Sequence, residues 1–105
     1  MTYEKLFEIL QSSGIPFRYH HFNKDKEPPP IPRGVYMFDN AESVFADGIT
    51  VMLLDNIRIE LYTATKDPDT EKKLETVLTD AEIPFEKVDE VYIENEKMYM
   101  IVYEI

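Results

Sequence analysis

Apolar and polar residues alternate along residues 57–63 in the middle of the chain, and residues 49–54 just before them form a second stretch rich in β-forming residues. Alternation with a period of two is typical of β-strands that bury one face. Asp55 and Asn56 separate the two stretches, and both residue types tolerate the backbone angles of a tight turn. We therefore predict an antiparallel hairpin with Asp55-Asn56 as its turn.

This hairpin would have two unlike faces. On one face Leu54 would lie opposite Ile57, and the apolar row would continue through Ile59 into the core. The other face would mix two kinds of residue: Ile49, Val51 and Leu53 on one strand, and Arg58, Glu60 and Tyr62 on the other. A face of this composition is too apolar for solvent and too polar for a core, so we predict that it binds a partner.

Two segments have the 3.6-residue spacing of amphipathic helices. The first is predicted to begin after Thr2 and to end before Gly14, and the second to begin at Asp67-Pro68-Asp69 and to end before Pro84. Asp67 would cap the second helix, because an aspartate before a proline at the first helical position is a typical start. The inward stripes would be Tyr3, Leu6, Phe7 and Leu10 in the first helix and Leu74, Val77, Leu78 and Ala81 in the second.

The remaining segments are predicted to be short strands and loops. Strands are expected at residues 15–22, 35–38, 91–93 and 98–105, the last two joined by a turn at 94–97. Residues 23–34 are charged and proline-rich, which favours an exposed, extended loop that displays Pro28-Pro29-Pro30. Residues 39–48 would form a second loop, anchored by Phe45.

These elements predict one α+β domain over residues 1–105. We expect an antiparallel sheet of about five to six strands with two helices packed mainly on the face that carries Ile57, Ile59 and Leu61. A chain of 105 residues is long enough to bury a single core. Two short helices can cover about one face of such a sheet, so the second face would stay uncovered and would favour self-association.

The composition narrows the range of partners. The chain carries 21 Asp and Glu against 11 Lys and Arg, a formal net charge of -10. Phosphate groups bind to basic surfaces, so we expect no direct contact with nucleic acid or with a membrane. The absence of Cys excludes disulfides and thiolate metal sites, and the sequence has no signal-peptide pattern or long apolar run. We expect a soluble protein.

No motif in the sequence indicates catalysis, a metal or a cofactor, and we predict none of them. His20 and His21 are the only histidines, and neighbours on a strand point to opposite faces, so we do not expect them to share an ion. The three glycines stand alone, without the spacing of a phosphate-binding loop. Residues 26–32 have the K-x-x-P-x-x-P spacing that aromatic grooves bind, which also suits a rigid loop or an assembly contact.

Several short blocks spread over nearly the whole chain share their order and spacing with one protein family. They are Tyr19-His20-His21-Phe22, Glu27-Pro28-Pro29-Pro30, Ala46-Asp47-Gly48, Ile59-Glu60-Leu61-Tyr62-Thr63 with Lys66-Asp67-Pro68, and Tyr103-Glu104. In these blocks the chain resembles small proteins of tailed phages and prophages of Gram-positive bacteria, which are placed among the head-tail joining and tail completion proteins. Ile31-Pro32-Arg33-Gly34 departs from the family pattern and makes the segment after the prolines longer or stiffer.

The resemblance implies a structural α+β protein, not an enzyme, that forms a ring in the neck or at the top of the tail tube. It would be made in the cytoplasm of the bacterial host and would end in the virion neck or tail. Its partners would be further copies of itself and tail or head-connector proteins. The alternative that the sequence leaves open is a small monomeric or dimeric prophage module that regulates a host protein.

The residues predicted to make these contacts come from three parts of the chain. They are Ile49, Val51, Leu53 and Tyr62 of the central hairpin, Pro28, Pro29 and Pro30 of the first loop, and Phe45 of the second. Burial of apolar area favours association, whereas a charge of -10 on every copy opposes it. We therefore expect self-association to be weak and to be promoted by salt.

Overall fold

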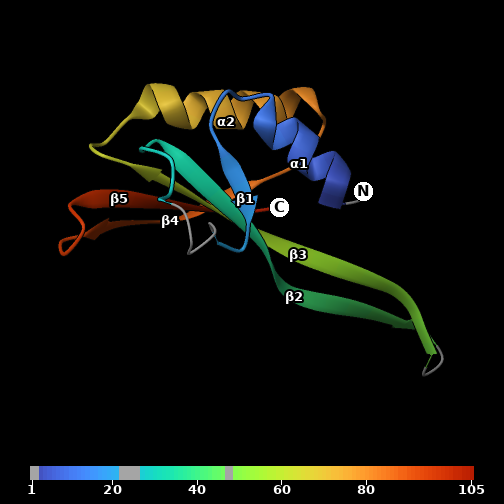
Figure 1. The fold of residues 1–105 in the computed structure, drawn as a ribbon. Helices are drawn as coiled ribbons and strands as arrows, with labels where there is room; N and C mark the ends of the chain where they lie inside the picture. The colour runs from blue at the N-terminus through green and yellow to red at the C-terminus, as the bar shows by residue number, and fades with distance from the viewer. Residues whose placement is uncertain (1–2, 22–26, 47–48) are drawn as a thin grey trace.

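The computed structural model describes residues 3–21, 27–46 and 49–105, and within the range 39–55 it describes the backbone alone. These residues form two helices and five strands: α1 (Tyr3–Gln11), β1 (Phe17–Tyr19), β2 (Arg33–Ala46), β3 (Ile49–Thr63), α2 (Pro68–Asp80), β4 (Glu86–Ile93) and β5 (Met98–Glu104). Both helices lie on the same side of the strands (Figure 1). The fold is α+β, as the sequence predicts.

The five strands form one sheet in the order β1-β2-β3-β5-β4. Three neighbouring pairs are antiparallel, but β1 runs parallel to β2, so the sheet is mixed and the prediction of a wholly antiparallel sheet is wrong at this edge. The physical reason is the length of the connection. Residues 20–32 separate β1 from β2, and a dozen or more residues are enough to return the chain to the end where it started.

The prediction of a hairpin turn at Asp55-Asn56 is also wrong. β3 is one continuous strand of 15 residues, and within it Asp55 and Asn56 pair with Ala41 and Asn40 of β2. Residues 39–46, predicted to lie in a loop, therefore form the outer part of β2, and Asp47-Gly48 lies outside the described residues. An Asp-Asn pair tolerates a tight turn without requiring one, and the β2 ladder supplies hydrogen-bonding partners for an extended backbone instead.

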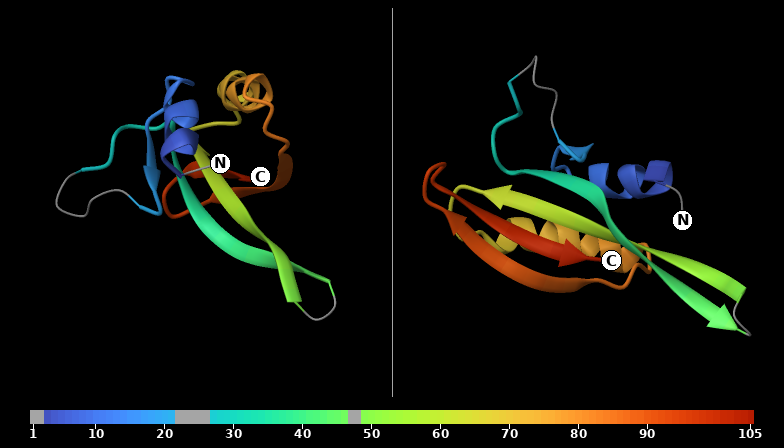
Figure 2. Two further views of the ribbon diagram at one scale, coloured as in Figure 1. Left: turned by 90° about the vertical axis from the view of Figure 1, so that its right-hand side faces the viewer. Right: turned by 90° about the horizontal axis from the view of Figure 1, so that it is seen from below.

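Beyond the body of the sheet, β2 and β3 continue as a two-stranded arm, formed by residues 39–46 and 49–56. Figures 1 and 2 show the arm leaving the body, and the molecule measures 50 Å along its longest axis against 29 and 24 Å across. β5 pairs with β3 over Arg58 to Thr63, and β1 pairs with β2 over Gly34 to Tyr36. In the described part of the chain, the arm strands thus pair with each other and with no third strand.

The core lies between the two helices and the body of the sheet. Ile59 and Leu61 are completely buried there and Ile57 packs against them, which confirms the predicted helix-facing side of the sheet. The core cluster comprises Leu6, Leu10, Ile15, Phe17, Tyr36, Ile59, Leu61, Leu74, Leu78, Ile83, Ile101 and Tyr103. Gly34 allows Phe17 to enter this cluster, because a Cβ at Gly34 would lie 2.2 Å from Cε1 of the Phe17 ring.

The second helix begins as predicted. Pro68 occupies its first turn, and the Asp67 side chain accepts a hydrogen bond from the Thr70 amide at 3.2 Å. Leu74 and Leu78 are completely buried on the inward stripe, whereas Ala81 follows the helix as its C-cap and is exposed. The predicted turn at 94–97 is confirmed, and the strand before it, β4, is longer than predicted because it follows β5 for its whole length.

The first strand is shorter than predicted. β1 ends at Tyr19, and His20 has a φ of 66°, which turns the chain out of the sheet. Arg33 and Gly34, predicted to lie in the proline-rich loop, belong to β2. The described loop residues 27–32 are exposed except for Pro29 and Ile31, which are half-buried.

Candidate interaction surfaces

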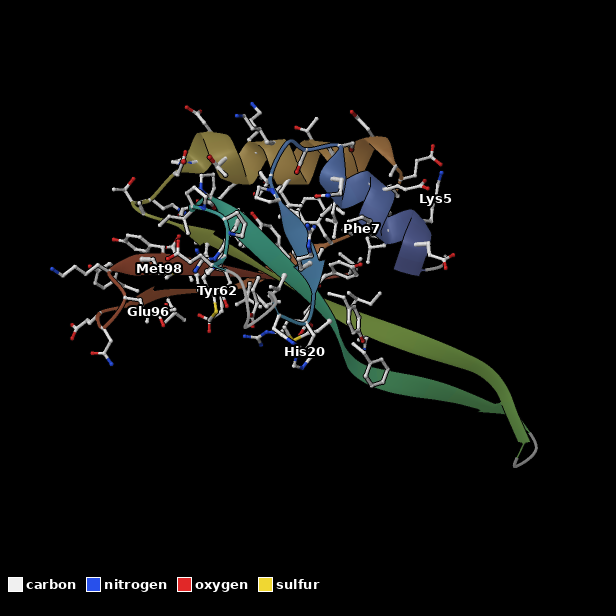
Figure 3. The ribbon with its side chains drawn as sticks, in the orientation of Figure 1. Lys5, Phe7, His20, Tyr62, Glu96 and Met98 are labelled. Atoms are coloured by element: carbon white, nitrogen blue, oxygen red, sulfur yellow. The ribbon has the colours of Figure 1, made fainter. Side chains whose placement is uncertain are left out.

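No helix of the described chain covers the sheet face away from the helices, and we call it the open face, although Val35, Met98 and Val102 on it are buried. Viewed from that side in Figure 2 (right), the strands lie in front of α2. In Figure 3, Tyr62 and Met98 lie at the strand layer and Lys5 lies at the helix layer. Strand register places these residues on the open face: Arg18, Arg33, Val35, Met37, Arg58, Glu60, Tyr62, Asp89, Val91, Ile93, Met98, Met100, Val102 and Glu104.

A hydrogen-bonded row of three β3 side chains crosses the centre of the open face. Arg58 donates from Nε to Glu60 Oε2 at 2.8 Å, and the Tyr62 hydroxyl donates to Glu60 Oε1 at 2.6 Å. Burial, together with this hydrogen bond to a carboxylate, raises the pKa of Tyr62 far above its usual value. Glu60 is thus neutralised by Arg58 and held in place from both sides, so the row forms a pre-organised polar strip between apolar neighbours.

All three arginines of the chain lie on the open face. The Nη1 atom of Arg18 donates to its neighbour Phe17 O at 2.8 Å, and that of Arg33 donates to Pro29 O at 2.9 Å. Arg58 is the Cα partner of Met37, and Arg33 is the Cα partner of Tyr62. The β1-β2-β3 half of the face is therefore basic in a chain of net charge -10, whereas Asp89 and Glu104 lie toward the β4 edge.

A second surface is a groove on the helix side, where α1 meets β1 and β2. It has a volume of about 710 Å³ and is lined by Phe7, Tyr19 and Tyr36, with Glu4 and Glu8 beside them. The Tyr19 and Tyr36 rings meet edge to face, 5.3 Å between centroids, and Phe7 lies 6.3 Å from Tyr36. The groove is thus an aromatic surface with an acidic rim, suited to an apolar or basic ligand.

A buried carboxylate ties α2 to the far edge of the sheet. Glu71 is 2 % exposed, and its Oε1 atom accepts hydrogen bonds from Lys66 at 3.1 Å and from Lys87 at 2.7 Å. Burial opposes ionisation of Glu71, but the two ammonium groups prevail and lower the pKa of the carboxyl. Lys87 also pairs with Glu75, and Lys66 with Glu90. This network links α2 to β4 and so helps to hold the body together.

The residues predicted to bind a partner fall into two separate groups, one on the arm and one on or beside the open face. Phe45, Ile49, Val51 and Leu53 are all on the arm, where the structure describes the backbone and not their side chains. Ile49 pairs with Ala46 and Leu53 with Ser43, so the predicted pairing with Arg58, Glu60 and Tyr62 is wrong.

Tyr62 belongs to the second group, on the open face. Its Cα partners are Arg33 on one side and Met100 on the other. Pro29 is attached to Arg33 through its carbonyl oxygen, and it is half-buried between the exposed Pro28 and Pro30. The proline segment therefore borders the basic half of the open face.

The arm, the three arginines and the aromatic groove are features that sequence reasoning missed. Alternation is interrupted by the apolar run 51–54 and by the polar pair Asp55-Asn56, so the pattern alone does not show that β3 continues through them. Arg33, Val35 and Met37 are spaced two residues apart and could have been assigned to one face once β2 was extended. The groove has no local signal, because it joins residues from a helix and two strands.

The two histidines do not point to opposite faces as predicted. The positive φ of His20 brings the rings together edge to face, with 3.1 Å between the two Nδ1 atoms. Both side chains are exposed. Across residues 3–21, 27–46 and 49–105, no group of three or more His, Asp and Glu side chains is placed to hold a metal ion.

No protein-family model and no curated protein matches this chain. Among the described helices, none has the length and apolar character needed to cross a membrane.

Proposed function

We propose that this protein is a structural subunit of a tailed-phage or prophage virion, a head-tail joining or tail completion protein. It self-associates, forms a ring, and contacts tail or head-connector proteins. The protruding arm is the observation that carries the proposal. It carries β2 and β3 beyond the strands that flank them in the body, where its described strands pair only with each other and can contact a neighbouring molecule.

An isolated two-stranded hairpin is marginally stable in water. The arm is longer than most hairpins, and its β3 strand contains the run Ile49-Thr50-Val51-Met52-Leu53-Leu54. Apolar side chains on such a strand are stabilised when another surface covers them, and the bare strand edges offer unpaired backbone groups to a further chain. A partner that covers the arm would bury the apolar side chains and would pair with the backbone groups at the strand edges.

The open face supplies a second, separate surface. It combines pre-organised polar groups with the half-buried apolar residues Met37 and Met100, and no helix of the described chain covers it. Two different surfaces on one subunit allow each copy to bind two neighbours, which is what a ring requires.

The virion setting is supported by the sequence blocks shared with neck and tail completion proteins. The net charge of -10 suits a protein that acts beside packaged DNA without binding it, because an acidic surface repels the phosphates. The subunit would accumulate in the host cytoplasm and be incorporated at the neck or tail during assembly.

The proposal is tested by measuring the mass of the purified protein by light scattering, across protein concentration and salt, alone and with the tail protein encoded beside it. We expect oligomers, and we expect Val51→Asp on the arm to abolish them and to block head-tail joining in an infection assay. Thr76→Asp, on the exposed side of α2, adds the same charge away from the arm and should assemble normally.

A parent protein that stays monomeric under every condition, together with normal tail joining by Val51→Asp, would overturn the proposal. In that case a monomeric regulator of a host protein would replace it.

A further inference from the structure

We propose that the acidic arm of one copy docks on the basic half of the open face of the next copy. This inference rests on the proposed function and names the two surfaces through which the copies meet. The arm and the face are different surfaces, so the contact is head-to-tail and each subunit uses one of each. A repeated contact of this kind closes into a ring when its rotation allows closure.

The charges of the two surfaces are complementary. The described arm, residues 39–46 and 49–56, contains three carboxylates, Asp39, Glu42 and Asp55, and no Lys, Arg or His. The open face carries all three arginines: Arg58 pairs with Glu60, and Arg18 and Arg33 donate hydrogen bonds to the carbonyls of Phe17 and Pro29. Complementary local charges select this docking among the contacts that two copies of an acidic protein could make.

The apolar residues of the two surfaces also suit each other. The arm is rich in branched aliphatic residues, and the open face offers the half-buried Met37 and Met100, whereas Met98 and Val102 are buried. Methionine is unbranched and adapts to irregular neighbours, which favours a surface that accepts another protein's side chains. Each arm strand spans about 25 Å at ~3.3 Å per residue, a length close to that of the seven-residue β5.

The arm cannot reach its own open face. Both belong to the same sheet, and the arm leads away from the body along β2 and β3 (Figures 1 and 2). The aromatic groove is a poorer site for the arm, because Glu4 and Glu8 at its rim would repel the arm carboxylates. The open face of a second copy is therefore the surface that matches the arm in both charge and apolar character.

A charge-exchange experiment tests the docking. One variant, Glu42→Lys/Asp55→Lys, reverses charges on the arm, and the other, Arg18→Glu/Arg58→Glu, reverses charges on the face. Each variant alone should associate about tenfold or more weakly than the parent, because like charges would meet at its contact. An equimolar mixture should regain association, since each arm then finds a face of opposite charge, and a chain with all four changes should also regain it.

Matched controls separate this contact from a change in net charge. Lys72→Glu/Lys73→Glu on the exposed side of α2 shifts the net charge as the face variant does and should associate like the parent. Circular dichroism checks that every variant is folded, and Arg18→Glu alone replaces the face variant if Arg58→Glu unfolds beside Glu60.

Failure of the mixture to associate, or equal weakening by the α2 control, would overturn the docking proposal. Neither result bears on the proposed function, which fails if the parent stays monomeric under every condition and Val51→Asp joins tails normally.

Discussion

The inner and outer halves of the β2-β3 ladder have the same strands and the same antiparallel pairing, yet they differ in everything around them. The inner half lies between β1 and β5 and under two helices, with Ile59 and Leu61 completely buried. The outer half is the arm, which extends away from the body and pairs with no other described strand. A residue in a strand therefore does not have to contribute to the core. One strand can stabilise the fold at one end and bind a partner at the other.

The inner half and the arm should differ most in the stability that is lost when an aliphatic side chain is truncated. Ile59→Ala removes a completely buried side chain from the inner half and should lower the free energy of unfolding by about 2 to 5 kcal/mol. Val51→Ala, the same kind of change on the arm, should cost the monomer less than about 0.5 kcal/mol. Urea unfolding at low protein concentration measures both. Equal losses would show that the arm packs against the body.

The Glu71 network gives the body a pH-dependent contribution to its stability. Glu71→Gln should destabilise the protein at neutral pH by about 2 kcal/mol, because a buried, charge-assisted pair with two lysines is lost. The pKa of Glu71 is lowered on folding from 4.5, so its contribution is present above that pH and is lost as the pH falls through the folded value.

Thermal unfolding at a series of pH values should therefore show the gap between parent and Glu71→Gln closing below about pH 4. A gap that persists unchanged in acid would mean that the Glu71 charge does not carry the effect.

Hydrogen exchange should resolve the same contrast along a single strand. Amides of β3 in the body are expected to exchange through global unfolding, whereas amides on the arm of a monomer should exchange faster by local opening, by a factor of about ten or more. Self-association should slow the arm amides selectively. Uniform protection along the whole of β3 in the monomer would contradict the division into body and arm.

The smallest expected effect on stability is that of Val51→Asp. Its free energy of unfolding as a monomer should stay within about 0.5 kcal/mol of the parent, although its association is abolished. Chemical denaturation beside light scattering measures the two properties independently. A large loss of monomer stability would assign Val51 to the core and not to a contact surface.

Local sequence was sufficient for the elements whose signals lie within a few residues. Asp67 and Pro68 predict the start of α2, because a cap and a proline act on the adjacent backbone. Ile59 and Leu61 were assigned correctly to the helix-facing side, since alternation within a strand determines which residues share a face.

Tertiary structure alone decided where β3 ends and what surrounds it. Asp55-Asn56 is compatible with a turn and with a strand, and pairing with β2 selects the strand. The parallel placement of β1, the gathering of three arginines on the open face and the aromatic groove all join residues distant in the chain. Residue preferences act over a few positions, whereas strand order and surface composition depend on contacts between separate segments, and the folded chain as a whole determines those.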